Sequence, residues 1–209
     1  MGSWVTIAQH DELEVVKLAA AALVVGRVLV MPTDSVYGMG CAAFEGNPAH
    51  ERIFQIKRRN RGQTLPLLVA DPADLGRLGR DVPAWAGKLA ASFWPGALTL
   101  VVRASDAVPA EYRASDGTVA LRCPNSDLVR KIARVVDMPL AVTSANTHGH
   151  STPAKSGQLE VRIVDEVDLT LDGGPAPLGV ASTIVGCLGD VPTILREGAI
   201  PTNEILQLG

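Results

Sequence analysis

The sequence lacks the features that mark membrane proteins, disulfide-rich proteins and strongly basic proteins. Its longest apolar run, residues 18–25, is far shorter than the ~20 residues of a membrane span, and the N-terminal residues show no signal-peptide pattern. The three cysteines, Cys41, Cys123 and Cys187, are widely spaced and form no CxxC pair, so neither a disulfide framework nor a thiolate zinc site is indicated. We therefore expect a cytoplasmic protein with no membrane association and with reduced thiols in its core.

Positive charge is scarce overall but concentrated in one place. A net charge of −3 gives no global nucleic-acid signature. Yet Lys57, Arg58, Arg59 and Arg61 fall within five residues, directly after a predicted helix that Asn47 caps. Cations suit a helix C-terminus. Four of them exceed what capping requires, which favours a local role in binding phosphate.

The rest of the chain is typical of a globular α/β protein. Of its 209 residues 47% are hydrophobic, with a mean hydropathy of +0.20, which suffices for a sizeable core. Strand-like and helical patterns alternate without a linker or a repeat, which predicts a single domain over residues 1–209. The connection 182–195 is too short for a crossover helix, so we expect a mixed parallel and antiparallel sheet. Strands are predicted at residues 28–31, 65–69, 98–102, 119–122, 140–143, 167–171, 182–185 and 193–195, and helices after Asp11, Asn47, Asp71, Pro83 and Asn125.

Two predicted strands end in polar side chains. Residues 28–42 read VLVMPTDSVYGMGCA, a strand buried on both faces that stops at Pro32 and a polar turn. The strand 140–143 ends in Ser144-Ala145-Asn146, whose hydroxyl and amide groups can bind phosphate oxygens or ribose. Open α/β sheets usually hold their ligands at such strand ends, although ordinary turns use the same residue types.

These segments carry a resemblance to the YrdC-like family, which includes threonylcarbamoyl-AMP synthases. PTDSVYG at 32–38 resembles the family's PTDTVYG, Lys57-Arg58-Arg59 its KxR motif, and Ser144-Ala145-Asn146 its SxN motif, in the same order. Further matches extend over nearly the whole chain: FWPGALTLVV at 93–102, TVALRCP at 118–124, LDGGP at 171–175, STIV at 182–185 and LREGAI at 195–200.

The resemblance implies a twisted α/β fold of the YrdC-like (DHBP synthase-like) type, with flanking helices and a concave basic face. It also implies synthesis of threonylcarbamoyl-AMP and pyrophosphate from ATP, L-threonine and bicarbonate, with Mg²⁺ assisting as in other ATP sites. Partner proteins would transfer the threonylcarbamoyl group to tRNA. The chain itself would bind tRNA weakly.

The family pattern also implies roles for individual residues. Lys57 and Arg59 would be catalytic, because they neutralise the phosphates. The ATP-binding set would be Lys57, Arg59, Thr118, Ser144, Asn146, Ser151 and Arg196. The threonine-binding set would be Thr33, Arg122 and Ser182, with Arg122 facing the carboxylate. An arginine at a strand end is by itself ordinary, so the flanking motifs carry these assignments.

The sequence departs from the family pattern in a few places. Asn60 stands where proline commonly follows KxR, residues 61–65 look altered, Glu197 replaces a proline, and Ser35 keeps the hydroxyl of the usual threonine. The conformation of the segment 60–65, which would form the loop over the phosphates, is therefore the part of the site that the resemblance defines least. Because the chain ends at Gly209, we expect the C-terminal domain of longer members to be absent.

Other chemical interpretations have weaker support. The sequence has neither a G-x-x-x-x-G-K-[ST] loop nor a G-x-S-x-G elbow. His148 and His150 could contact a metal, but no third ligand lies nearby, so we expect no metal site. Two alternatives stay open: a non-catalytic RNA-binding module that uses the same basic concavity, and a paralogue that makes another carbamoyl-adenylate.

Overall fold

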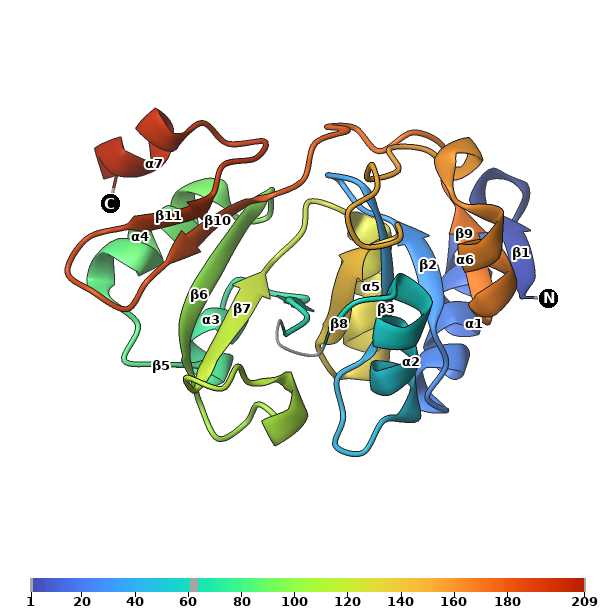
Figure 1. Cartoon of the computed structure of the whole chain (residues 1–209), viewed down its shortest axis with the longest axis horizontal. Coiled ribbons are helices and arrows are strands. Elements are labelled where there is room, and N and C mark those ends of the chain that lie inside the picture. The colour runs from blue at the N-terminus through green and yellow to red at the C-terminus, as the bar shows by residue number, and fades with distance from the viewer. Residues whose placement is uncertain (1, 61–63, 209) are drawn as a thin grey trace.

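The computed structural model describes residues 2–60 and 64–208 and is built on one mixed sheet (Figure 1). Its strands lie in the order β1-β9-β2-β3-β8-β4-β7-β6-β10-β11, and β5 pairs with β6. Their bounds are Ser3–Thr6 (β1), Leu29–Pro32 (β2), Tyr37–Ala42 (β3), Leu67–Leu68 (β4), Gly79–Arg80 (β5), Leu98–Ala104 (β6), Thr118–Arg122 (β7), Leu140–Ser144 (β8), Leu169–Asp172 (β9), Thr183–Gly186 (β10) and Thr193–Arg196 (β11).

Parallel and antiparallel pairs are both present, which confirms the predicted mixed sheet. The pairs β2–β3, β3–β8, β4–β8, β6–β7 and β10–β11 are antiparallel. The pairs β1–β9, β2–β9, β4–β7 and β6–β10 are parallel. The short connection between β10 and β11 forms a hairpin, as its length requires.

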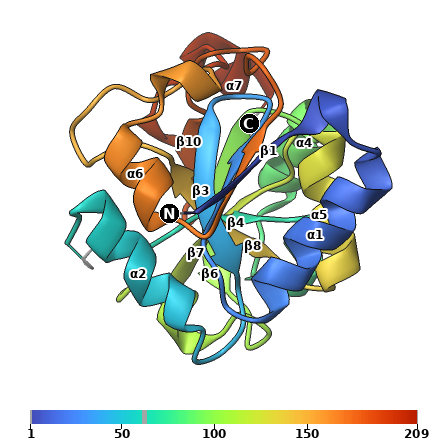
Figure 2. The same cartoon turned by 90° about the vertical axis from the view of Figure 1, so that its right-hand side faces the viewer.

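Helices lie on both sides of the strands, with α1 and α5 on one side and α2 and α6 on the other (Figure 2). The α-helices span Glu12–Val24 (α1), Pro48–Lys57 (α2), Asp74–Leu78 (α3), Ala84–Phe93 (α4), Asp127–Val136 (α5), Val161–Glu166 (α6) and Thr202–Leu208 (α7). Short 3-10 helices cover Ile7–Gln9 (η1), Ala110–Tyr112 (η2) and Ser156–Gln158 (η3).

Local sequence signals explain where the two best-defined helices start. The Asp11 carboxylate accepts hydrogen bonds from the backbone N–H groups of Leu13 and Glu14 at the start of α1, and Asn47 caps α2 ahead of Pro48 in the same way. Gly26, with φ of 75°, follows the end of α1. The spacing of the apolar residues predicts Leu13 and Val24 on the buried face of this helix, but both are exposed.

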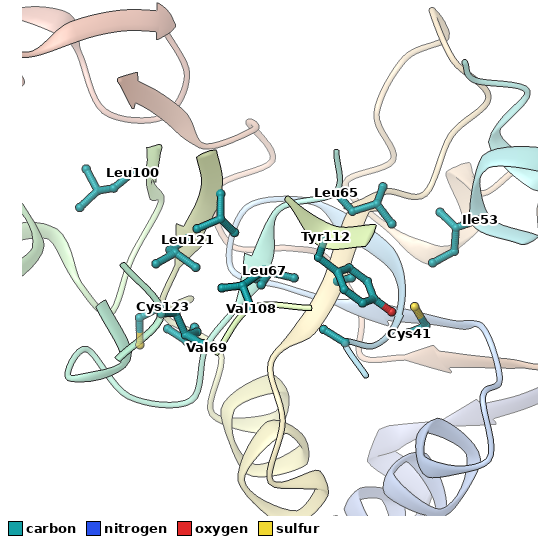
Figure 3. Packing of buried hydrophobic residues seen from close by; sticks show 14 of the residues in the cluster. Cys41, Ile53, Leu65, Leu67, Val69, Leu100, Val108, Tyr112, Leu121 and Cys123 are labelled. Carbon is teal, nitrogen blue, oxygen red and sulfur yellow. The ribbon is translucent and has the colours of Figure 1, made fainter. Parts of the chain in front are cut away.

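The core consists of two clusters, one on each side of the sheet. On one side, buried residues of α1 and α5 such as Leu23 and Ile132 pack on β2 and β8. On the other, Ile53 of α2 belongs to a larger cluster with residues from β3, β4, β6 and β7 (Figure 3). Cys41, Cys123 and Cys187 are buried free thiols, as expected.

Every predicted strand is present within a few residues of its expected bounds, but β3 was missed. The sequence analysis predicted no strand at residues 37–42, because Gly38 and Gly40 follow the polar residues after Pro32. In the structure these glycines lie in a buried strand against Val142, and a Cβ on either would come within 2.6 Å of that side chain. Glycine is therefore needed here for close packing between strands, not for a turn. Strands β1 and β5 and helices α6 and α7 were not predicted either.

The two-residue strand β4 connects the two ends of the sheet. It pairs with β8 on one side and with β7 on the other. We call β1, β9, β2, β3 and β8 the β3–β8 half, and β7, β6, β10 and β11 the β6–β7 half. Figure 1 shows the two halves on opposite sides of the molecule.

Candidate functional site

A cleft of about 490 Å³ is lined by residues of both halves of the sheet. Eight of the ten sequence-predicted site residues line it: Thr33, Lys57, Arg59, Arg122, Ser144, Asn146, Ser182 and Arg196. They come from the β2–β3 turn, the end of α2, the ends of β7, β8 and β11, and the residue before β10. Motifs far apart in the sequence thus share one concave surface.

Lys57 is the most constrained cation of the cleft. It is 4% exposed, and its Nζ donates to Ser144 O (2.8 Å), Asn146 Oδ1 (3.0 Å) and Asn146 O (3.1 Å), with Ser144 Oγ at 3.2 Å. Burial lowers the pKa of Lys57 to about 8, with help from the nearby charge of Arg59 and against the effect of Glu160. The oxygens that the described residues offer to Nζ are all neutral, so these hydrogen bonds bring no opposite charge to Lys57.

The end of α2 explains why Lys57 and Arg59 reach the cleft and Arg58 does not. Arg58 adopts a left-handed conformation, φ 53°, and Arg59 N donates to Phe54 O (3.0 Å), which closes the helix. The left-handed residue reverses the chain, so that Arg58 is exposed while Arg59 lines the cleft. Burial lowers the pKa of Arg59. Arg61, the fourth cation of the cluster, lies outside the described residues, as does part of the altered segment 61–65.

Ser144 and Asn146 line the cleft beside Lys57 and contact its Nζ. Ser144 Oγ donates to Asn146 Oδ1 (2.6 Å), and Asn146 Nδ2 donates to the carbonyls of Thr147 (3.1 Å) and His150 (2.6 Å). The amide thus holds both Lys57 and the loop that follows β8. This explains in structural terms why a lysine motif and an SxN motif occur in one chain.

Arg122 lies at the other end of the cleft and is compensated differently. It is 5% exposed and donates to Asp34 Oδ1 (2.5 Å), Ser35 Oγ (2.8 Å) and Gly96 O (2.9 Å). Burial lowers its pKa, and the Asp34 carboxylate opposes that effect. Three of its five N–H groups are used in this way. Sequence reasoning placed Asp34 and Ser35 in the motif but gave neither a role.

Several hydroxyl groups from both halves of the sheet line the cleft together with Arg122. Thr33 Oγ1 donates to Val36 O (2.6 Å) and lies 3.0 Å from Ser35 Oγ. On the β6–β7 half, Ser182 Oγ lies 2.8 Å from Thr99 Oγ1, and Arg196 Nη2 donates to Ser182 O (2.7 Å). Burial first, and the charge of Arg122 second, lower the pKa of Arg196.

Two predicted site residues do not line the cleft. Thr118 begins β7, four residues before Arg122, and its hydroxyl donates to Asp116 Oδ1 (2.6 Å). The flanking motif pointed to the right strand, but Ala120 and Arg122 of that strand line the cleft and Thr118 does not. Ser151 is exposed on the loop after β8, where its neighbour Thr152 lines the cleft instead.

The described lining residues of the cleft include no carboxylate. Nor do residues 2–60 and 64–208 contain a group of three or more His, Cys, Asp or Glu side chains that could hold a metal. His150 instead faces Glu160, with Nδ1 3.4 Å from Oε1. Among the helices described, none has the length and apolarity to cross a bilayer.

The fold and the cleft define an α/β protein whose cleft has Lys57 and Arg59 at one end and Arg122 with several hydroxyl groups at the other. The model of the Sua5–YciO–YrdC family, described as telomere recombination, matches residues 21–198. This chain therefore belongs to that family, as its motifs indicated.

Comparison with known proteins agrees on the fold. The crystal structure of Pyrococcus abyssi Sua5 complexed with L-threonine superposes with a TM-score of 0.86 at 30% identity, covering 100% of this chain and 60% of that chain. Two relatives are named threonylcarbamoyl-AMP synthase, from Pyrococcus abyssi at 33% identity and from Bacillus subtilis at 35%. They align with 91% and 90% of this chain, which spans 56% and 54% of their own lengths.

Proposed function

We propose that this chain synthesises threonylcarbamoyl-AMP from ATP, L-threonine and bicarbonate and releases pyrophosphate, as a nucleotidyltransferase. The observation that carries the proposal is one cleft with two cations, Lys57 and Arg59, at one end and a buried arginine, Arg122, together with hydroxyl groups at the other. The names of its relatives and the threonine bound by the Pyrococcus abyssi protein support the same conclusion.

The end of the cleft with Lys57 and Arg59 suits the phosphates of ATP. Arg59 brings a planar guanidinium that matches phosphate oxygens, and Lys57 adds a fixed positive charge nearby. Ser144 and Asn146 hold that charge in place before the substrate arrives, so little reorganisation is needed during the reaction. In this proposal, these groups stabilise the negative charge that develops on the departing pyrophosphate.

The end with Arg122 suits the carboxylate of threonine. Two Arg122 N–H groups remain after its three described bonds, which is enough to bind a carboxylate. Thr33 and Ser182 lie around this arginine and offer hydroxyl groups to the amino acid. Binding at both ends would place the amine of threonine between Arg122 and the α-phosphate.

The reaction then proceeds in two balanced steps. The threonine amine adds to bicarbonate with loss of water and gives a carbamate. A carbamate oxygen bonds to the α-phosphorus of ATP, the bond from that phosphorus to the bridging oxygen breaks, and pyrophosphate leaves. The protein's contribution is to position the reactants and to stabilise charge. Because the described lining offers no carboxylate to Mg²⁺, any such ion would arrive with ATP, and no step here depends on it.

The proposed setting of the reaction follows from its product. A threonylcarbamoyl-adenylate is an activated donor, so a separate transferase would pass its acyl group to tRNA. We propose that the chain acts as a single domain over residues 1–209, in the cytoplasm where ATP and tRNA occur, and that it binds tRNA only weakly because its net charge is −3.

The decisive experiment measures pyrophosphate release from ATP and the mass of the adenylate product, with threonine or bicarbonate omitted in turn. The proposal expects release that needs both and a product that contains threonine and a carbamate carbon. Release without threonine, stimulated by another amine or by carbamoyl phosphate, would indicate a different carbamoyl-adenylate. Tight, salt-sensitive tRNA binding without any nucleotide affinity would instead support an RNA-binding module.

A further inference from the structure

His148 lies in a turn that faces the cleft. The turn is closed by a hydrogen bond from His150 N to Thr147 O (3.0 Å), and Gly149 has φ of 85°. A positive φ on the third residue is typical of a type II turn, which puts His148 at the second position. His148 and Gly149 both line the cleft beside Lys57, Arg59 and the SxN residues.

The turn is held rigidly on both sides. His148 N donates to Lys57 O (2.9 Å), which attaches the turn to the end of α2. Thr147 donates to Glu160 through its backbone N–H (2.7 Å to Oε1) and its hydroxyl (2.6 Å to Oε2). These two bonds, the hydroxyl first, lower the pKa of the Glu160 carboxyl. Asn146 Nδ2 holds the far side through His150 O (2.6 Å).

The two histidines of this turn therefore have different surroundings. His150 is directed to Glu160, with Nδ1 3.4 Å from Oε1, and does not appear among the described residues of the cleft wall. His148 is exposed and belongs to that wall. Both carry the same ring two residues apart, so each is a control for the other.

A hydrogen-bond donor is useful where His148 lies. Lys57 has three N–H groups and four protein oxygens within 3.2 Å, so it supplies charge at this end of the cleft while its hydrogens stay engaged. A phosphate chain needs donors as well as charge. A neutral imidazole offers one N–H donor, and a protonated imidazole offers two. Either form can donate to a phosphate oxygen.

We propose that His148 is a binding residue that donates a hydrogen bond to the phosphate chain of a bound nucleotide. This inference rests on the proposed function, because it takes the nucleotide to be ATP. In this inference the two histidines of the loop have separate roles. His148 contacts the nucleotide, and His150 packs beside Glu160.

Two measurements on the full chain test this inference. The first is the Kd for ATP by calorimetry in wild type, His148→Ala, His148→Gln and the control His150→Ala. We expect about 10-fold weaker binding for His148→Ala, a loss of about 3-fold for His148→Gln, which retains a donor, and a change below 2-fold for His150→Ala. Unchanged binding in His148→Ala would overturn the inference, and so would an equal loss in His150→Ala.

The second measurement uses diethylpyrocarbonate modification of the wild type, mapped by mass spectrometry. ATP should protect His148 at least ~5-fold and leave His150 unprotected, since only the first is expected to contact the nucleotide. Equal reactivity of His148 with and without ATP would overturn the inference alone. A wild type that shows no ATP binding in either measurement would overturn the proposed function together with it.

Discussion

The two ends of the cleft hold buried cations in different ways. Lys57 is surrounded by four neutral oxygens from the β8 loop, whereas Arg122 is paired with the carboxylate of Asp34. Hydrogen bonds to neutral groups leave a charge in place, and an ion pair cancels most of it. The hydrogen bonds of Lys57 therefore bring no opposite charge to it, as the proposed phosphate site requires, while the charge of Arg122 is already paired, which leaves room for a single carboxylate in the proposed threonine site. This difference would orient a nucleotide and an amino acid along the cleft.

The origin of each set of contacts also differs. The partners of Lys57 are Ser144, at the end of β8, and Asn146, just after it. Helix α2, which carries Lys57, packs on β3, and β3 lies beside β8 in the β3–β8 half. Asp34, in the β2–β3 turn, contacts Arg122 of β7 across to the other half. Between these halves the two-residue strand β4 supplies the sheet connection. The Asp34–Arg122 pair is thus also a direct contact between the two halves.

The largest expected effect comes from breaking that pair. Asp34→Asn would leave a buried guanidinium without its carboxylate, which typically costs about 3–5 kcal/mol of unfolding free energy. Urea denaturation measures this loss. The control is Lys131→Gln, which removes an exposed ion pair with Glu12 and should cost less than about 1 kcal/mol. Similar losses in both variants would show that Asp34 does not hold the two halves together.

The next effect concerns the end of the cleft with Lys57 and Arg59. Lys57→Ala and Arg59→Ala should each lower pyrophosphate release at least ~100-fold, because removing one preorganised group of this kind typically costs a few kcal/mol of transition-state stabilisation. The matched control is Arg58→Asn, which keeps a residue that tolerates the left-handed backbone at an exposed position. Circular dichroism verifies the fold of each variant. An equal loss in the Arg58 variant would contradict separate roles for the three cations.

The smallest expected effect is a pH-dependent uptake of protons when ATP binds near Lys57. The pKa of Lys57 is lowered to about 8, and a bound phosphate should raise it, because an anion favours the charged form. ATP binding should then take up about half a proton at pH 8, less at pH 7 and nearly one at pH 9. Calorimetry in buffers of different ionisation enthalpy measures this uptake. An uptake that stays constant from pH 7 to pH 9 would argue against Lys57 as the titrating group.

Sequence reasoning found most of the fold because local signals were strong. The caps at Asp11 and Asn47 marked helix starts, and apolar runs marked the strands. It missed β3, since Gly38 and Gly40 are local signals for a turn, while the reason for them is the side chain of Val142, on the neighbouring strand β8, which lies close to both. Packing between segments a hundred residues apart leaves no local trace.

Within the site, the sequence alone identified the family motifs and the strand ends that carry them. Lys57, Ser144, Asn146 and Arg122 line one cleft because those motifs end neighbouring elements. Only the tertiary structure decided how their charges are balanced: that Asp34 is the partner of Arg122, that Thr118 lies at the far end of its strand, and that His148 and His150 face different surroundings. A motif specifies which groups are present, but burial and pairing depend on distances between remote segments, and these are fixed only when the whole sheet has formed.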